Sequence, residues 1–195
     1  FTVTEDVPYT STAYNTITLK QGRTVVKQSG QTGSVTRTYR RTIENGVLVN
    51  TEIVGETVNK TMVPEIKLVG VPAGTPQVTP PFTVALDSSG QPVNYKAKYN
   101  GRATAYSSDR GYAGTWTASG RRATVGTVAV NPNIIPYGSK LYIVSPDGSL
   151  VYGYAIAADT GKALMSGHAV ADLFFTHYEE CLYFGAKSMN VYVLE

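Results

Sequence analysis

Two aspartates in the C-terminal half of the chain occupy positions that suit acid–base chemistry. Asp172 is preceded by an alanine and followed by the apolar residues 173–175, and Asp159 ends the apolar segment 155–158. An apolar environment raises the pKa of a carboxyl group, so Asp172 could hold a proton for donation. Asp159 could be a second carboxylate that raises this pKa or orients the acid. It also precedes Thr-Gly, which is typical of an aspartate in a turn.

The histidine and cysteine residues give weaker indications of chemistry than the aspartates. His168 and His177 stand on different predicted elements, which favours surface or packing positions over a metal site. Cys181 lies among apolar and aromatic residues of a predicted helix, which favours packing. A single cysteine forms neither an internal disulfide nor a cysteine cage for zinc. We therefore expect no metal and no cofactor.

Composition excludes several classes of protein. Of 195 residues, 42% are hydrophobic and 16% charged, which is too apolar for a disordered chain. No apolar stretch approaches the roughly 18 residues that span a membrane. A net charge of +3, with only two adjacent basic pairs, argues against nucleic-acid binding. The chain starts at Phe1, so we expect any anchor or export signal to lie in missing upstream regions.

The first 75 residues alternate in the period of two that strands require. Residues 35–43 and 47–53 flank Glu44-Asn45-Gly46, and Asn-Gly is the strongest short hairpin signal. Few large apolar side chains are available here. The sequence therefore predicts an elongated, thin sheet module over residues 1–75.

A proline-rich passage separates the two halves. Pro72, Pro76, Pro80, Pro81 and Pro92 suppress helices and central strands. We predict a semi-rigid linker over residues 76–94.

The last hundred residues predict a small closed barrel. Six candidate strands and one short helix fall within residues 95–195. The helix is predicted to begin at Thr176, with Glu179 completing a capping box. The predicted strands are 95–107, 125–131, 139–145, 150–158, 169–175 and 187–194. The fold class is thus all-β.

The front half resembles the five-glycine domain, a module of bacterial cell-wall proteins. The resemblance lies in the order of three loose motifs: TGSVTRTY (32–39), ENG (44–46) and VPEIKLVG (63–70). It implies a wall-binding or spacer role for residues 1–75.

The back half more specifically resembles the 3D domain, named for three aspartates. The matching motifs are ATAY (103–106), TASG (117–120), VAVNP (128–132), IPYGSKL (135–141), AADTG (157–161) and ADLFF (171–175). The family fold is a double-psi β-barrel, similar to the catalytic barrel of membrane-bound lytic transglycosylase A. The family includes secreted stationary-phase survival proteins that cleave peptidoglycan glycan. Both modules together are typical of Gram-positive cell-wall proteins.

This resemblance implies a glycan lyase. In lytic transglycosylation one carboxyl group protonates the leaving oxygen between N-acetylmuramic acid and N-acetylglucosamine. It then accepts the proton of the sugar's C6 hydroxyl, which gives a 1,6-anhydro product. By resemblance Asp172 is the acid/base and Asp159 its partner. Tyr106 and Trp116 are expected to stack on sugar faces, while Tyr112 and Tyr137 are weaker candidates.

One position departs from the family pattern, because Asn131 stands where the first aspartate is expected. An amide can hold a substrate hydroxyl or N-acetyl group, but it cannot raise a neighbouring pKa by charge. Two rival functions therefore stay open: a non-catalytic peptidoglycan-binding module, and a hydrolase that leaves a reducing sugar. In each case the expected partner is peptidoglycan and the expected location is secreted or cell-wall associated.

Overall fold

The computed structural model describes residues 1–111 and 113–195, which form two compact units. The first unit comprises Phe1–Tyr14 and Thr24–Leu68, and the second comprises Asn15–Arg23 and Val69–Glu195. Residues 76–94, expected as a linker, fall within the second unit. In the described ranges, no helix has the length and apolar character needed to cross a membrane.

Two three-stranded sheets contain the front strands. In the first, β4 (Gly33–Glu44) lies between β1 (Thr2–Val7) and β5 (Val47–Lys60), and both pairings are antiparallel. The second has the order β2 (Ser11–Thr16), β6 (Glu65–Gly70) and β3 (Thr24–Gln28).

The predicted Asn-Gly hairpin joins β4 to β5. Asn45 and Gly46 both adopt positive φ, 52° and 82°, as a two-residue type I′ turn requires. Glu44 pairs with Val47 directly across the turn. The hairpin signal therefore identified the turn.

The first unit has little core, as its composition predicts. Among its buried hydrophobic residues are Val35 and Leu68, whereas many side chains of β4 and β5 are exposed. The exposed apolar residues of this hairpin are Ile43, Val47, Leu48, Val49, Ile53, Val54 and Val58. The expected thin sheet is confirmed.

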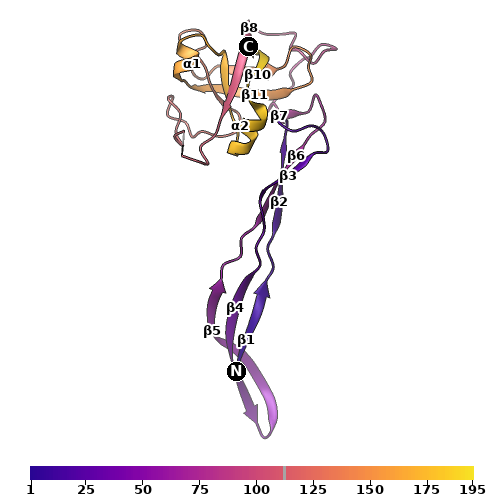
Figure 1. Ribbon diagram of the computed structural model, residues 1–195, viewed down its shortest axis with the longest axis vertical. Coiled ribbons are helices and arrows are strands. Elements are labelled where there is room, and N and C mark those ends of the chain that lie inside the picture. Colours follow the sequence, from indigo (N-terminus) through magenta and orange to yellow (C-terminus); the bar gives the residue numbers. More distant parts are fainter. Residues whose placement is uncertain (112) are drawn as a thin grey trace. The chain divides into compact units, whose positions relative to one another are not determined.

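A closed six-stranded barrel forms the second unit, as predicted (Figure 1). The strands follow one another in the order β10-β13-β8-β12-β9-β11, and a β10–β11 pairing closes the ring. Five of them lie within the predicted ranges, and β11 extends one residue beyond its range, to Asp159. Their bounds are β8 Ala97–Tyr106, β9 Thr127–Ala129, β10 Lys140–Val144, β11 Val151–Asp159, β12 Ala171–Phe174 and β13 Lys187–Val193.

The barrel interior is filled by alternate residues of these strands. Val128, Val130, Ala171 and Leu173 are fully buried in one apolar cluster. Because successive side chains of a strand point to opposite faces, the residues between them point out of the barrel. Asp172, between Ala171 and Leu173, is one of those outward residues.

The proline-rich segment packs on the barrel. Within it, β7 (Pro76–Val78) adds a seventh strand parallel to β11. Gln91 donates a hydrogen bond to the Ser145 carbonyl and accepts hydrogen bonds from Asn190 Nδ2 and the Tyr192 hydroxyl. A buried amide with all these partners fixes the segment to β13 and to the turn that follows β10.

Within residues 1–111 and 113–195 two helices are present where one was expected, and the predicted helix start was wrong. The helix α2 (Tyr178–Phe184) has His177 as its N-cap, with Glu180 completing the capping box. The prediction placed this box one residue earlier because Thr-x-x-Glu and His-x-x-Glu overlap here. The additional helix, α1 (Lys162–Met165), is a single turn between β11 and β12.

Candidate active site

The strand β9 lies between the two strands that carry the candidate aspartates. Ala129 on β9 pairs with Asp172 on β12 and with Asp159 on β11. Two strand spacings place the two aspartate Cα atoms roughly 10 Å apart. The pairing of β9 with both β11 and β12 thus places the two carboxyl groups at the same height on the sheet.

Both aspartates lie on the outer face of the barrel. Ala129 belongs to a small apolar cluster with Leu164 and Ala169, against which Tyr106 packs. This cluster is separate from the barrel interior, and residues that pair across a sheet share a face. We call this surface, defined by Asp172, Ala129 and Asp159, the aspartate face.

Asp172 has the environment that the sequence suggested for an acid. It is partly buried, and Thr104 Oγ1 donates a hydrogen bond of 2.8 Å to its Oδ1. Burial raises the pKa of Asp172; the hydrogen bond from Thr104 opposes this rise, and the charge of Asp159 adds to it. The raised pKa favours a protonated carboxyl group, which can donate.

Asp159 is held as a hydrogen-bond acceptor. The backbone N–H groups of Ala118 and Thr160 both donate to its Oδ1, at 2.9 Å each. The Tyr106 hydroxyl donates to its Oδ2 at 3.2 Å. These three hydrogen bonds fix the orientation of the Asp159 carboxylate relative to Asp172.

Tyr106 donates to Asp159 and lies close enough to Asp172 to feel its charge. Its ring packs edge-on against Phe174, with 5.3 Å between ring centroids. Burial raises the pKa of the Tyr106 hydroxyl, and the charges of Asp159 and Asp172 raise it further. The hydroxyl therefore stays a neutral donor near both carboxyl groups. Sugar stacking, the role expected for Tyr106, stays a prediction.

Trp116 lies on a loop that is tied to the aspartate face. The loop is joined to β11 through Ala118, which donates to Asp159, and through Ser119, whose N–H donates to the Ala158 carbonyl. The Trp116 side chain is 61% exposed, and the Arg122 guanidinium lies 5.5 Å from its ring centroid. An exposed indole at this place is available to stack on a sugar.

Asn131 lies two residues beyond Ala129. Its Oδ1 accepts a hydrogen bond of 3.0 Å from the Asn133 N–H. The residue also lines a cavity of about 200 Å³, together with Leu164 and Ala169 of the cluster around Ala129. Its role in binding substrate stays a prediction.

Thr104 was missed as a site residue, although its motif was recognised. In the segment 103–106 the alternation of small apolar residues with Thr104 and Tyr106 places both on the aspartate face, and that signal was present in the sequence. Among the weaker stacking candidates, Tyr137 is exposed, and Tyr112 lies outside the described residues. No group of three or more metal-ligating side chains occurs within the described residues.

An exposed sheet joined to a closed barrel defines a two-module β protein. Residues 1–71 match the G5 domain family and residues 126–195 match the 3D domain family. The chain therefore carries a G5 domain followed by a 3D domain, and the resemblance seen in the sequence is confirmed. The 3D match includes Asn131, Asp159 and Asp172, whereas Tyr106 and Trp116 precede it.

Two curated relatives come from Bacillus subtilis (strain 168). The "Putative cell wall shaping protein YabE" is 32% identical over 135 residues, covering 64% of this chain and 31% of the relative. The "Cell wall-binding protein YocH" is 36% identical over 96 residues, covering 47% of this chain and 31% of the relative. The chain thus spans about a third of the length of these relatives.

The chain is also similar to two solved structures of G5 domains. The HP0197 G5 domain is 24% identical with a TM-score of 0.32, covering 36% of this chain and 91% of the solved chain. The IgA1 protease G5 domain is 24% identical with a TM-score of 0.25, covering 36% and 83%.

Proposed function

We propose that this protein acts at the bacterial cell wall and cleaves the peptidoglycan glycan strand by lytic transglycosylation. The observation that carries the proposal is the placement of Asp172, a partly buried carboxyl group of raised pKa, level with Asp159 on the aspartate face. The names of YabE and YocH, which refer to the cell wall, support the location outside the cytoplasm.

In the proposed reaction Asp172 carries the proton. Its carboxyl O–H protonates the glycosidic oxygen, and the bond from that oxygen to C1 of N-acetylmuramic acid breaks. The C6 hydroxyl oxygen of the same sugar bonds to C1, and its proton passes to the Asp172 carboxylate. The acid is restored, and the product is a 1,6-anhydro sugar without consumption of water.

The neighbouring residues position this chemistry. Thr104 fixes one oxygen of Asp172 by its hydrogen bond, which leaves the other oxygen for the glycosidic bond. Asp159 keeps a negative charge close to the cationic sugar that forms as the bond breaks. In this proposal Trp116 holds a sugar ring by stacking, and Asn131 holds a substrate hydroxyl or N-acetyl group.

The closed six-stranded barrel supports the proposal, because the sequence resemblance to the catalytic barrel of membrane-bound lytic transglycosylase A implies a barrel fold. In this proposal the G5 domain adheres to the wall and keeps the barrel at its substrate.

A non-catalytic binding module is the second candidate, and two observations favour it. The name of the relative YocH refers to binding of the cell wall, and Asn131 replaces one family carboxylate. A binding module would use the same outer face without transferring a proton.

Digestion of purified sacculi by the chain, followed by mass spectrometry of the soluble products, separates these functions. Anhydro ends are the expected result. Reducing ends would show a hydrolase, and sedimentation of the chain with intact sacculi that release no fragments would show a binding module. Either of those results would overturn the lytic transglycosylase.

A further inference from the structure

A second concave site lies within the barrel unit, and its lining includes neither Asp159 nor Asp172. Its volume is about 640 Å³, which is the size of many ligand sites. Its lining comes from residues 17–21, 71–75, 145–150 and 187–188, all within the second unit. The 145–150 turn precedes Val151, the first residue of β11, whereas Asp159 ends that strand. Eight residues of strand place this turn roughly 26 Å from Asp159. The other side of the pocket is closer to Asp172, because Lys187 pairs with Ala103, which also pairs with Ala171.

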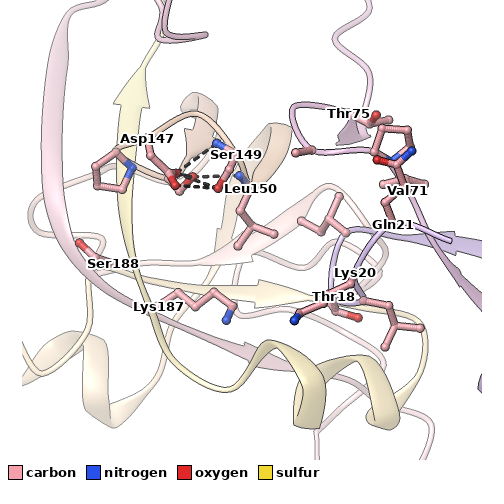
Figure 2. A pocket seen from close by; sticks show the side chains of 16 residues that line it. Thr18, Lys20, Gln21, Val71, Thr75, Asp147, Ser149, Leu150, Lys187 and Ser188 are labelled. Carbon is pink, nitrogen blue, oxygen red and sulfur yellow. Dashed lines mark hydrogen bonds between the residues drawn. The ribbon is translucent and has the colours of Figure 1, made fainter. Parts of the chain in front are cut away.

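Two lysines give this pocket a cationic side. Lys20 and Lys187 lie along one side in Figure 2, and both side chains are exposed. Lys187 lies 5.9 Å from the Phe184 ring centroid. In the described part of the chain, neither ammonium group has a carboxylate within ion-pair distance. Both charges are therefore available to an anionic ligand.

The opposite side carries one negative charge. Ser145 and Ser149 donate hydrogen bonds to the Asp147 carboxylate, and these lower its pKa. Asp147 therefore stays ionised across the physiological range. A second anionic group of a ligand would be repelled here, whereas a peptide N–H could donate to this carboxylate.

The pocket also has an apolar surface. Ile17 and Leu19 are buried, and Val71 and Leu150 are partly buried. Small aliphatic side chains would lose their exposed surface against these residues, at a gain of about 25 cal/mol per Å². The pocket thus offers cations for a carboxylate, an acceptor for a peptide N–H, and a surface for methyl groups.

From these features we propose that the pocket binds a short peptide that ends in a free carboxylate. The carboxylate lies between Lys20 and Lys187, and the backbone N–H groups face Asp147. This proposal rests on the proposed function, because the glycan strands of a cell wall carry short alanine-containing peptides. It assigns the barrel a peptide site in addition to the glycan site.

The test uses the intact chain and the peptide diacetyl-L-Lys-D-Ala-D-Ala, with titration calorimetry as the measurement. Saturable binding that weakens at least tenfold when the C-terminus is amidated is the expected result. The double variant Lys20→Gln/Lys187→Gln should lose at least tenfold in affinity. The exposed Lys96, which does not line the pocket, supplies the matched control Lys96→Gln.

The outcomes separate this proposal from the glycan chemistry. Asp172→Asn should bind the peptide as tightly as the unmodified chain, whether or not that chain cleaves sacculi. Equal binding of the acid and the amide, an equal loss in Lys96→Gln, or no saturable binding would each overturn the peptide site. None of these results would bear on the release of anhydro sugars.

Discussion

Asp159 and Asp172 stand two strands apart but level with each other, because both pair with Ala129 from opposite sides of β9. Thirteen positions separate them in the sequence, and the single-turn helix α1 lies between their strands. The pairing gives the two carboxyl groups different environments. Asp172 is partly buried and accepts a hydrogen bond from Thr104, whereas Asp159 accepts hydrogen bonds from three donors.

The pH dependence of stability should change when Asp172 is replaced. The folded-state pKa of Asp172 is raised, so the folded state keeps its proton over a range in which the unfolded state has lost it. The free energy of unfolding contributed by this group is therefore largest below the unfolded pKa and declines as pH rises through the folded pKa. Asp172→Asn removes that decline.

Thermal unfolding of both proteins over a series of pH values measures this effect. Asp172→Asn should equal or exceed the wild-type midpoint at neutral pH, and the difference should shrink toward acid pH. If the midpoint of Asp172→Asn falls below that of wild type at neutral pH and recovers toward acid pH, the raised pKa of Asp172 would be contradicted.

The Tyr106 hydroxyl should matter to activity more than to stability. Tyr106→Phe removes the donor to Asp159 Oδ2 but keeps the ring that packs on Phe174. We expect cleavage of sacculi to slow about tenfold, which corresponds to about 1.4 kcal/mol of activation free energy. The loss of unfolding free energy should be about 1 kcal/mol. Initial rates and denaturant unfolding of the same preparations check this, and an unchanged rate would exclude the role.

Restoring the family carboxylate tests the departure at Asn131. Asn131→Asp keeps an oxygen that can accept from the Asn133 N–H, so the fold should persist. An added negative charge near the acid raises the pKa of Asp172. Because cleavage requires protonated Asp172, the decline of activity with rising pH should move to higher pH. A pH–rate profile of both proteins measures it. A profile that keeps its position while KM changes would assign this residue to substrate binding.

Gln91 should be essential to the stability of the barrel unit. Gln91→Ala leaves Asn190, Tyr192 and the Ser145 carbonyl without their buried partner. An unsatisfied buried polar group costs about 1–3 kcal/mol, so we expect at least that loss of unfolding free energy. Asn133→Ala, at an exposed side chain, is the control and should stay within about 0.5 kcal/mol. Equal unfolding midpoints for the two variants would refute the role.

The periodic features of the fold could be predicted from the sequence. Alternate residues of β9 and β12 enter the barrel's apolar cluster, and the Asn45-Gly46 turn dictates its own conformation. The single-turn α1 is too short to show a helical period. The docking of residues 76–94 depends on Gln91 meeting Asn190 and Tyr192, about a hundred positions away, and no local pattern carries that information.

In the candidate site, too, some features could be predicted from the local sequence and others depend on the fold. The apolar neighbours of Asp172 indicated a raised pKa, because they are adjacent in the chain. The donors to Asp159 come from Tyr106 and Ala118, which only the closed barrel brings near. Sequence motifs therefore identified the carboxyl groups but not their hydrogen-bond partners.

Mass spectrometry of sacculi digested by wild type and by Asp172→Asn tests the central claim most directly. Asp6→Asn, at an exposed aspartate of the first unit, serves as the control for a lost carboxylate. Wild type and the control should release fragments with 1,6-anhydro ends, and Asp172→Asn should release none while keeping its thermal midpoint. Anhydro ends released by Asp172→Asn, or no cleavage by wild type, would contradict the account.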